Sequence, residues 1–519
     1  MPRLTIDDRE VEVAEGATVL DAARKLGLDI PALCHLDGHP PNTSCFACVV
    51  KVQGREALVP SCATRAEDGM RVESETEEVR TARTTALELL LGDHVGDCAA
   101  PCQGTCPAHM DIPQMVRQLV AGDLLGAIRT VKAHIALPAV LGRICPAPCE
   151  RGCRRALEDA GLSIMLLKRR AADADLESAV PYLPPCRPAS GKHVAIVGAG
   201  PTGLAAAYYL LQCGHACTIY DDHDEPGGGL RYEVPADRLP REVLDAEIAV
   251  VRRLGARFRM GVRAGRDITL ADIQKDSDAV VLALGELKID GAAWVGIPVT
   301  EAGLPADRHT FETSVVGVFA GGDAVRRTRL AVRSVADGRT IAESVDQYVS
   351  GRQVVGPHTM LSVHIGSIAE AELQQFLAGA SAEARLAPAG GAGAGLTQDE
   401  ARAEADRCLH CDCRKPLTCK LRLYGDKYGA KIGHYKGKRK PFVQLLDHPE
   451  IVYEPGKCIA CGICLRIAEE AREPLGLAFI GRGFQVRVGV PLGHSLADGL
   501  RTCAKACAEA CPTGAIAVK

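Results

Sequence analysis

The sequence is poor in aromatic residues and has no long apolar run. Aromatic residues make up 4% of its 519 residues and Trp occurs once, so base stacking on nucleic acid has little to work with. No apolar stretch approaches the roughly 18–20 residues that a membrane span requires. The net charge of −4 favours neither nucleic acid nor an anionic membrane as the main partner. With an N-terminus too polar for a secretory signal, these absences predict a soluble, cytoplasmic protein.

Cysteine, by contrast, is abundant. The chain has 23 cysteines, most of them in runs with two or three residues between neighbours. Without a secretory signal a disulfide framework is not expected, and such short spacings suit metal or cluster ligation better than bridges. The cysteines therefore predict several iron–sulfur centres, with zinc as the alternative.

The first group of cysteines follows two short alternating strands and a helix within residues 1–75. Cys34, Cys45, Cys48 and Cys62 have the spacing C-x10-C-x2-C-x13-C, and the first three lie in a loop rich in Gly, Pro, Asn and Ser. Four thiolates suffice for a [2Fe–2S] centre, whereas a zinc ribbon prefers two paired CxxC knuckles. The stretch resembles the [2Fe–2S] domain that opens the large iron–sulfur subunit of respiratory complex I and of NAD-linked hydrogenases.

A second group carries two overlapping resemblances. Residues 89–98 resemble the His-plus-cysteines motif of the complex I subunit, while residues 102–112 and 141–153 resemble the glutamate synthase small-subunit family. The latter family holds two [4Fe–4S] clusters in this region. The resemblance implies one cluster on His94, Cys98, Cys102 and Cys153, and another on Cys106, Cys145 and Cys149.

This group departs from the glutamate synthase pattern in two ways. The first run has three cysteines where four ligand positions are expected. The Gln or Glu that completes the second cluster in that family falls near Lys168 and Arg169. The fourth ligand of the Cys106 cluster therefore stays open, and the chain is expected to hold three or four [4Fe–4S] clusters.

Residues 193–221 carry a dinucleotide-binding pattern. A buried strand leads into Gly198, Gly200 and Gly203, then into an Ala-rich helix, a second strand and Asp221. The glycines permit a tight turn, close approach of the backbone to a pyrophosphate and close packing of helix on strand. The acid after the second strand can accept the ribose hydroxyls.

Two later segments, residues 225–238 and 316–324, resemble the remaining flavin-binding motifs of the glutamate synthase family. They imply that the dinucleotide is FAD. The implied FAD site comprises Gly198, Gly200, Pro201, Thr202, Gly203, Asp221, Gly228, Gly229, Leu230, Arg231, Arg238, Gly285, Gly322 and Asp323.

A second dinucleotide-binding unit is missing. In the glutamate synthase family an NAD(P)H-binding unit lies between the equivalents of Gly285 and Gly322, but here only residues 286–321 separate them, without a G-x-G-x-x-G. A βαβ fingerprint alone needs about 30 residues. We therefore expect no independent hydride-transfer site, and we expect a partner that exchanges electrons with NAD(P).

The C-terminal third predicts two more clusters. Cys408, Cys411, Cys413 and Cys419 suggest a [4Fe–4S] cluster, with zinc as the alternative. Further on, a C-x2-C-x2-C run takes its fourth ligand from a distant Cys-Pro, as ferredoxins do, which predicts a cubane on Cys458, Cys461, Cys464 and Cys511. Ala468 stands where a second cubane would need cysteine, so Cys503 and Cys507 are left over, with Cys507 as the alternative to Cys511. This segment also resembles the complex I subunit.

These patterns predict a multidomain fold class with seven segments. The sequence indicates a β-grasp [2Fe–2S] ferredoxin domain, an α-helical iron–sulfur domain, an α/β Rossmann-like FAD domain without the NAD(P)H subdomain and an α+β ferredoxin-like [4Fe–4S] domain. With linkers and a Cys-rich segment, the expected boundaries are 1–78, 79–180, 181–191, 192–352, 353–397, 398–445 and 446–519.

The resulting functional hypothesis is an electron-transfer subunit of a multisubunit oxidoreductase, without catalytic side chains of its own. FAD and the clusters would relay electrons between a complex I-like NAD(P)-binding flavoprotein and a terminal catalytic subunit or ferredoxin. Flavin-based bifurcation stays open. One alternative is a self-sufficient NAD(P)H:ferredoxin or NAD(P)H:acceptor oxidoreductase. The other is a non-catalytic redox-sensing or assembly protein.

Overall fold

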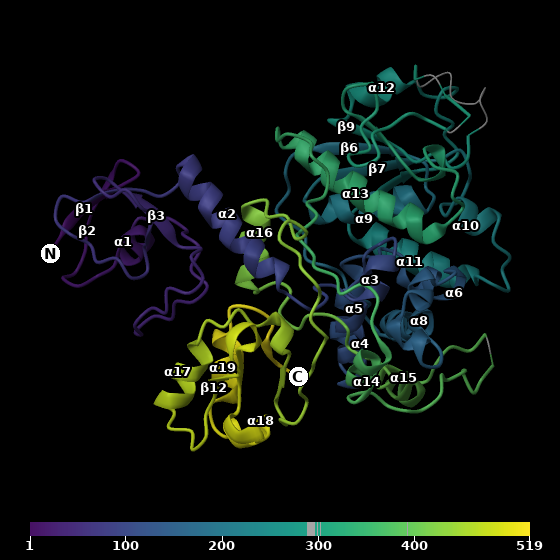
Figure 1. Cartoon of the computed structure of the whole chain (residues 1–519). Coiled ribbons are helices and arrows are strands. Elements are labelled where there is room, and N and C mark those ends of the chain that lie inside the picture. The colour runs from purple at the N-terminus through teal and green to yellow at the C-terminus, as the bar shows by residue number, and fades with distance from the viewer. Residues whose placement is uncertain (288–295, 298, 302, 392) are drawn as a thin grey trace. The chain divides into compact units, whose positions relative to one another are not determined.

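The computed structural model describes residues 1–287, 296–297, 299–301, 303–391 and 393–519. They form two compact units that interleave along the chain (Figure 1). Unit 1 contains residues 1–99, 360–379 and 410–519, and unit 2 contains residues 100–359 and 380–409. No helix in the described ranges is both long and apolar enough to cross a membrane.

Unit 1 begins with a mixed five-stranded sheet that packs on helix α1 (Val19–Lys25). The strand order is β2-β1-β5-β3-β4, in which β1 and β5 are parallel and the other pairs antiparallel. Thr18 and Asp21 form a capping box that starts the helix. Alternating apolar residues such as Leu4 and Ile6 build the core. The strands are β1 (Arg3–Ile6), β2 (Arg9–Glu12), β3 (Val49–Val52), β4 (Val59–Pro60) and β5 (Arg71–Glu73).

Two helices continue unit 1 beyond the sheet. Helix α2 (Glu77–Gly92) packs against α16 (Lys420–Lys427). Arg83 is fully buried at this junction, where it donates to the carbonyl of Val49 and to the hydroxyl of Tyr428 at 2.7 Å. A buried guanidinium needs such partners. It therefore ties the N-terminal sheet to a segment from the far end of the sequence.

The C-terminal part of unit 1 consists of two antiparallel strand pairs and several short helices. The pairs are β11 (Ile451–Tyr453) with β14 (Ile516–Val518) and β12 (Ala478–Ile480) with β13 (Arg487–Gly489). Apolar residues from both pairs share one core. The helices are α17 (Ile463–Glu470), α18 (Leu496–Gly499) and α19 (Ala504–Ala510), and α14 (Glu370–Leu377) also belongs to unit 1.

Unit 2 starts with a bundle of short helices. Proline stands at the first or second position of several of them, where its missing N–H costs nothing. The helices are α3 (Pro101–Thr105), α4 (Ile112–Val120), α5 (Leu124–Lys132), α6 (Pro138–Ile144), α7 (Pro148–Arg151) and α8 (Ile164–Glu177), joined later by α15 (Gln398–Ala405).

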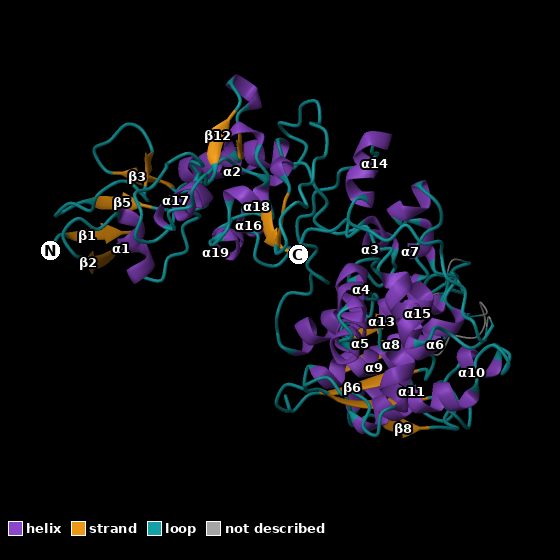
Figure 2. Cartoon of the chain, turned by 90° about the horizontal axis from the view of Figure 1, so that it is seen from below, coloured by secondary structure: helices purple, strands orange, loops and turns teal. Residues whose placement is uncertain are grey.

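A parallel five-stranded sheet forms the other part of unit 2. Its order is β10-β9-β6-β7-β8, and helices α9, α11 and α13 lie beside it (Figure 1 and Figure 2). Gly338 lets α13 approach α9 closely, because a Cβ there would lie 2.4 Å from the carbonyl oxygen of Thr202. The strands are β6 (His193–Val197), β7 (Ala216–Tyr220), β8 (Arg257–Arg259), β9 (Ala279–Leu282) and β10 (Val318–Ala320). The helices are α9 (Pro201–Gln212), α10 (Gly229–Tyr232), α11 (Arg241–Arg253), α12 (Leu270–Lys275) and α13 (Ala331–Val349).

The multidomain architecture agrees with the sequence, but the order of assembly differs from seven consecutive segments. Residues 360–379 and 410–519 fold with residues 1–99, so the middle of the chain forms a unit inserted between parts of another. Helices α4 and α5 are separate, because Gly122 turns at φ 73° and Asp123 caps α5. Residues 385–389, within the expected linker, hydrogen-bond to Glu150, Glu400 and Glu404.

Candidate functional site

The four cysteines of the N-terminal loop lie together in unit 1. All of them are buried, and the Sγ atoms of Cys48 and Cys62 are 3.4 Å apart. Hydrogen bonds from Cys45 and Cys62 lower the pKa of the Cys34 thiol. Four mutually interacting thiols in one buried loop are the soft donor set that a [2Fe–2S] cluster requires.

A second group in unit 1 brings Cys98 together with Cys413 and Cys419, and His94 lies near it through the shared neighbour Lys457. The amide of Cys413 donates to the carbonyl of Cys98 at 3.4 Å, and Cys98 shares an apolar core with Cys419. The negative charges of Cys413 and Cys98 act on Cys419, although burial is the main cause that raises its pKa to about 11. These residues come from segments far apart in sequence that unit 1 joins.

His94 fits this group as a neutral ligand. Its side chain is partly buried, and its buried Nδ1 has no hydrogen-bond partner among the described residues. Burial and then the ammonium of Lys457 lower the pKa of His94 to about 3, so its imidazole is neutral. A metal ligand must be unprotonated in this way.

The ligand sets expected from the sequence, which place Cys102 and Cys153 with His94 and Cys408 with Cys413, stay predictions. Cys102, Cys153 and Cys408 belong to unit 2, and Cys98 and Cys413 belong to unit 1. Within unit 2, Arg155 donates to the carbonyl of Arg407 at 3.4 Å and so links the loop after Cys153 to the residue before Cys408.

The helical part of unit 2 holds a cavity that we call the helical-domain cavity. Cys106, Cys145 and Cys149 line it, as expected for one cluster. Its remaining lining residues are Pro107, Met110, Ile135, Ala147, Pro148, Ile164, Met165, Lys168 and Val332. Burial raises the pKa of the Cys149 thiol to about 12.

A second cavity, the C-terminal cavity, lies in unit 1. Cys458, Cys461, Cys464 and Cys511 all line it, and the rest of its wall is mostly apolar. Cys507 is not part of this wall, and its Sγ lies 3.6 Å from the carbonyl oxygen of Cys464 and 3.9 Å from Sγ of Cys503. The geometry thus favours the Cys-Pro cysteine over Cys507 as the fourth residue.

The dinucleotide pattern forms a glycine cradle at the start of α9. Gly198 has φ 112°, and a Cβ there would lie 2.1 Å from the carbonyl oxygen of Ala283. A Cβ on Gly228 would lie 2.8 Å from the Cα of Gly200, so the second flavin segment reaches the first. No side chain caps α9, which leaves its first amides available to a phosphate. Pro201, Thr202 and Gly203 form the first turn of this helix.

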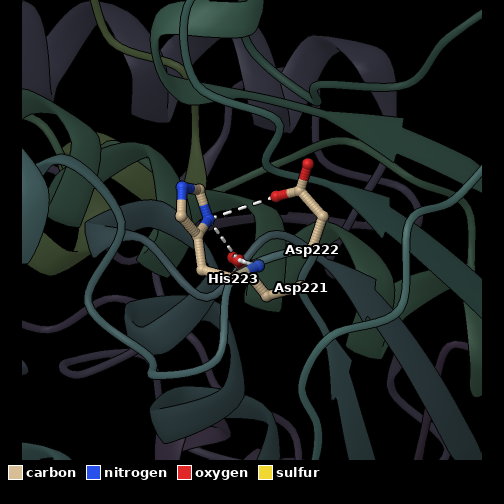
Figure 3. A group of neighbouring side chains, drawn as sticks. All are labelled: Asp221, Asp222 and His223. Carbon is tan, nitrogen blue, oxygen red and sulfur yellow. Dashed lines mark hydrogen bonds and ion pairs between the residues drawn. The ribbon is translucent and has the colours of Figure 1, made fainter.

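Asp221 ends β7 beside this cradle. Its Oδ2 accepts from the amide of Ala199 at 2.6 Å, and its Oδ1 accepts from the amide of His223 at 2.9 Å. The ring of His223 lies between the carboxylates of Asp221 and Asp222, at 2.7 and 3.1 Å (Figure 3). Asp221 therefore holds the glycine loop in place, a role that sequence reasoning did not assign to it.

The last flavin segment lies against the same helix. A Cβ on Gly322 would lie 2.3 Å from Oγ1 of Thr202, and Asp323 accepts from the amides of Thr328 and Arg329, both at 3.0 Å. Asp337 of α13 accepts from the amide of Gly322 and pairs with Arg326, although burial raises its pKa to about 6.

The remaining predicted flavin residues are placed less specifically. Arg231 pairs with Glu225 and Asp245, while Gly229 and buried Leu230 belong to α10. Arg238 lies in the exposed turn before α11. Gly285 has φ 68° after β9.

Sequence reasoning missed the buried charged residues near these groups. Lys457 of unit 1 pairs with Glu454 and is close to the His94 group, and Glu247 of unit 2 accepts from the amides of Ala139 and Val140. Single ionisable residues in apolar stretches carry no spacing signal, so these two could not be found without the fold.

Family comparisons agree with the domain kinds. Residues 2–77 match the 2Fe-2S iron-sulfur cluster binding domain, and residues 77–180 match dihydropyrimidine dehydrogenase domain II, 4Fe-4S cluster. Residues 145–338 match the pyridine nucleotide-disulphide oxidoreductase family. The chain carries iron–sulfur and oxidoreductase domains. The predicted resemblances and the prediction of an oxidoreductase subunit are therefore confirmed.

The relatives are subunits of several different oxidoreductases. The chain is 41% identical over 189 residues to NADPH-Fe(3+) oxidoreductase subunit beta of Geobacter sulfurreducens, covering 36% of this chain and 28% of the relative. It is 35% identical over 270 residues to NADP(+)-dependent formate dehydrogenase subunit beta of Moorella thermoacetica, covering 45% and 38%. It is 35% identical over 204 residues to the glutamate synthase (NADPH) small chain of Mycobacterium tuberculosis, covering 39% and 41%. The chain thus spans less than half the length of each of these relatives.

Among solved structures, an NAD+-reducing [NiFe]-hydrogenase aligns over 100% of this chain and 87% of that chain, with a TM-score of 0.34 and 13% identity. A likeness this low carries no argument.

Proposed function

We propose that the chain is the electron-transfer subunit of a multisubunit oxidoreductase. It relays electrons between an NAD(P)-linked flavoprotein partner and a terminal redox subunit or ferredoxin. The relatives support the assignment to oxidoreductase subunits in general, because the NADPH-Fe(3+) oxidoreductase and formate dehydrogenase relatives are themselves beta subunits.

The arrangement of β9 and β10 is the observation that carries this proposal. The two strands are direct neighbours in the parallel sheet, with Val318 opposite Val280. Between them, the described residues contain no helix or strand that could belong to a second nucleotide-binding unit, while residues 288–295, 298 and 302 lie outside the described ranges. A nucleotide domain needs far more chain than this. The flavin therefore exchanges electrons with clusters or a partner rather than with bound NAD(P)H.

Four groups of residues would hold iron–sulfur clusters. The chemistry of the donor sets fits, since each group gathers buried or partly buried thiols among apolar residues. When bound, clusters supply one-electron transfer, and FAD links one-electron to two-electron chemistry. The groups are Cys34, Cys45, Cys48 and Cys62 for [2Fe–2S], and His94, Cys98, Cys413 and Cys419, then Cys106, Cys145 and Cys149, then Cys458, Cys461, Cys464 and Cys511 for [4Fe–4S].

The protein's own residues bind, orient and exclude water. The apolar walls of both cavities keep solvent from the thiolates, and the neutral His94 adds a ligand without adding negative charge. The glycine cradle and the free amides of α9 receive the FAD pyrophosphate. No side chain of this chain has to act as a general acid, base or nucleophile.

Anaerobic mixing of the purified chain with NADH or NADPH tests this function. We expect the flavin absorbance to stay unchanged on the time scale of turnover without a partner, and to bleach when dithionite or a purified NAD(P)-linked partner complex is added. Rapid bleaching by NAD(P)H alone would favour the self-sufficient reductase. Iron and FAD analysis of the same sample is the second readout, and fewer than two clusters would favour the redox-sensing or assembly protein.

A further inference from the structure

The helical-domain cavity offers three cysteines as ligands for a cluster and no fourth cysteine. Apart from the cysteines, the only side chains in its wall that carry a heteroatom are Lys168, Met110 and Met165, within the residues the structure describes. A cubane has four iron corners, and three cysteines can hold three of them. The residue at the fourth corner is therefore one of these side chains or none.

Lys168 is the side chain that needs an explanation. It lies on α8 with 4% of its surface exposed, and no hydrogen bond or ion pair joins it to another described residue. Two other lysines are equally buried, and each has a carboxylate: Lys132 lies 2.5 Å from Asp175, and Lys457 pairs with Glu454. Lys168 differs from these two lysines, because no carboxylate among the described residues pairs with its ammonium.

The neighbours of Lys168 do not supply the missing negative charge. Arg169, the next residue on α8, pairs with Asp173 at 3.1 Å and donates to the carbonyl of Gly393. Glu150 accepts from the amide of Met165 and pairs with Arg385. The group that Lys168 does face is the cysteine set, because its charge acts on the Cys149 thiol. A cluster with three thiolates would bring negative charge to this place.

We propose that Lys168 stands at the fourth corner of the cluster held by Cys106, Cys145 and Cys149 and acts as its charge partner, so that this cluster has only three protein thiolates. This inference rests on the proposed function, which places a cluster in the cavity. Lys168 is a positioning residue that sets the reduction potential. A nearby positive charge stabilises the reduced, more negative form of a cluster, so it raises the potential.

The test is a redox titration of the intact chain, followed by EPR, with Lys168→Met. At the midpoint potential of the wild-type cluster, we expect the ratio of reduced to oxidised cluster to fall about tenfold, which is about 59 mV for a one-electron couple. Lys168→Arg, which keeps the charge, should restore most of the shift. If Lys168→Met does not fold, Lys168→Leu provides a second neutral variant. Arg170→Met is the matched control, because it removes a positive charge from the same helix at a partly exposed position.

The outcomes separate this inference from the proposed function. An unchanged potential in Lys168→Met, with the cluster signal present, overturns the role of Lys168 alone. A signal lost in Met165→Leu or Met110→Leu but kept in Lys168→Met also overturns it, because the fourth corner then belongs to a thioether. If Cys149→Ser leaves the iron content and every EPR signal of the chain unchanged, the cavity holds no cluster, and the proposed function loses this centre together with the inference.

Discussion

The C-terminal cavity of unit 1 and the helical-domain cavity of unit 2 have similar lining residues. They differ in the hydrogen bonds and charged groups near those residues. Cysteines set among apolar side chains line both. Neutral hydrogen bonds frame the C-terminal cavity: the hydroxyl of Tyr453 donates to the carbonyl of Val488 at 2.7 Å, and Thr513 donates to the carbonyl of Lys457 at 2.9 Å. Its four cysteines would suffice for a cubane, and no charged side chain lies in its wall among the described residues.

Charged groups frame the helical-domain cavity instead. Lys168 lies in its wall, and Glu247 of α11 accepts from the amides of Ala139 and Val140 at 2.7 and 2.9 Å. These amides begin α6, the helix that ends directly before Cys145. Four cysteines can hold all four iron corners of a cubane. Three cysteines leave one corner to another residue, and the wall of the helical-domain cavity offers a charged side chain there. The centre in unit 2 should therefore respond to single charge changes and to pH.

The largest effect is expected from the cysteine that completes the C-terminal cavity. Cys511→Ser should remove one complete cluster, about four iron atoms per chain, together with its EPR signal. Cys507→Ser is the matched control, because this thiol faces Cys464 and Cys503 rather than the cavity, and it should retain the cluster. Iron analysis and EPR of the reduced protein measure both. Cluster loss in Cys507→Ser with retention in Cys511→Ser would reverse the assignment.

A second prediction concerns the regrouped ligands of unit 1, which also combine fewer than four cysteines. Cys98→Ser and Cys413→Ser should each abolish the same EPR signal, because the two residues are joined by a backbone hydrogen bond. His94→Ala should shift that signal or remove it, since Lys457 acts on His94 as well as on the thiols of Cys98 and Cys413.

The control for this grouping is Cys408→Ser. Cys408 belongs to unit 2, so the signal shared by the Cys98 and Cys413 variants should persist when it is replaced. If Cys408→Ser and Cys413→Ser remove the same signal while Cys98→Ser leaves it, the set expected from chain spacing holds instead.

The sequence was informative where the ligands are close in the chain or follow a known rule. The strand–glycine–helix pattern predicted β6, α9 and β7 at their observed positions, and the distant Cys-Pro rule predicted which cysteines line the C-terminal cavity. It was not informative about contacts between distant segments. The set of Cys98 and Cys102 that the resemblance implied stays a prediction, whereas the backbone hydrogen bond between Cys413 and Cys98 joins residues that spacing cannot bring together across such a distance.

Buried charged residues were the other feature that the sequence did not predict. Glu247 stands in an ordinary amphipathic helix pattern, and nothing in the residues around it distinguishes it from the exposed Glu242 on the same helix. Only the packing of α11 against α6 makes it a cap for amides of another helix. Such a role depends on tertiary contacts, which local propensity and periodicity do not encode.

The smallest predicted effect tests the charged frame of the helical-domain cavity through Glu247. Burial raises the pKa of this carboxyl to about 7 from 4.5, although the two amides, Lys132 and Arg143 oppose the shift. The folded state therefore binds the proton more tightly than the unfolded state. Its stabilising contribution is fully present below pH 4.5 and is lost as the pH rises through about 7, at most about 3 kcal/mol of local stability.

Hydrogen exchange of the intact, cluster-loaded chain between pH 5 and 8 measures this contribution locally, after correction for intrinsic exchange rates. The opening free energy at Ala139 and Val140 should fall with rising pH in the wild type and lose this pH dependence in Glu247→Gln. Glu242→Gln, an exposed change on the same helix, should keep the wild-type slope. A slope that is equally steep in Glu247→Gln would mean that the carboxylate does not titrate in this range. The two cavities would then differ in their fourth residue but not in how charge supports their walls.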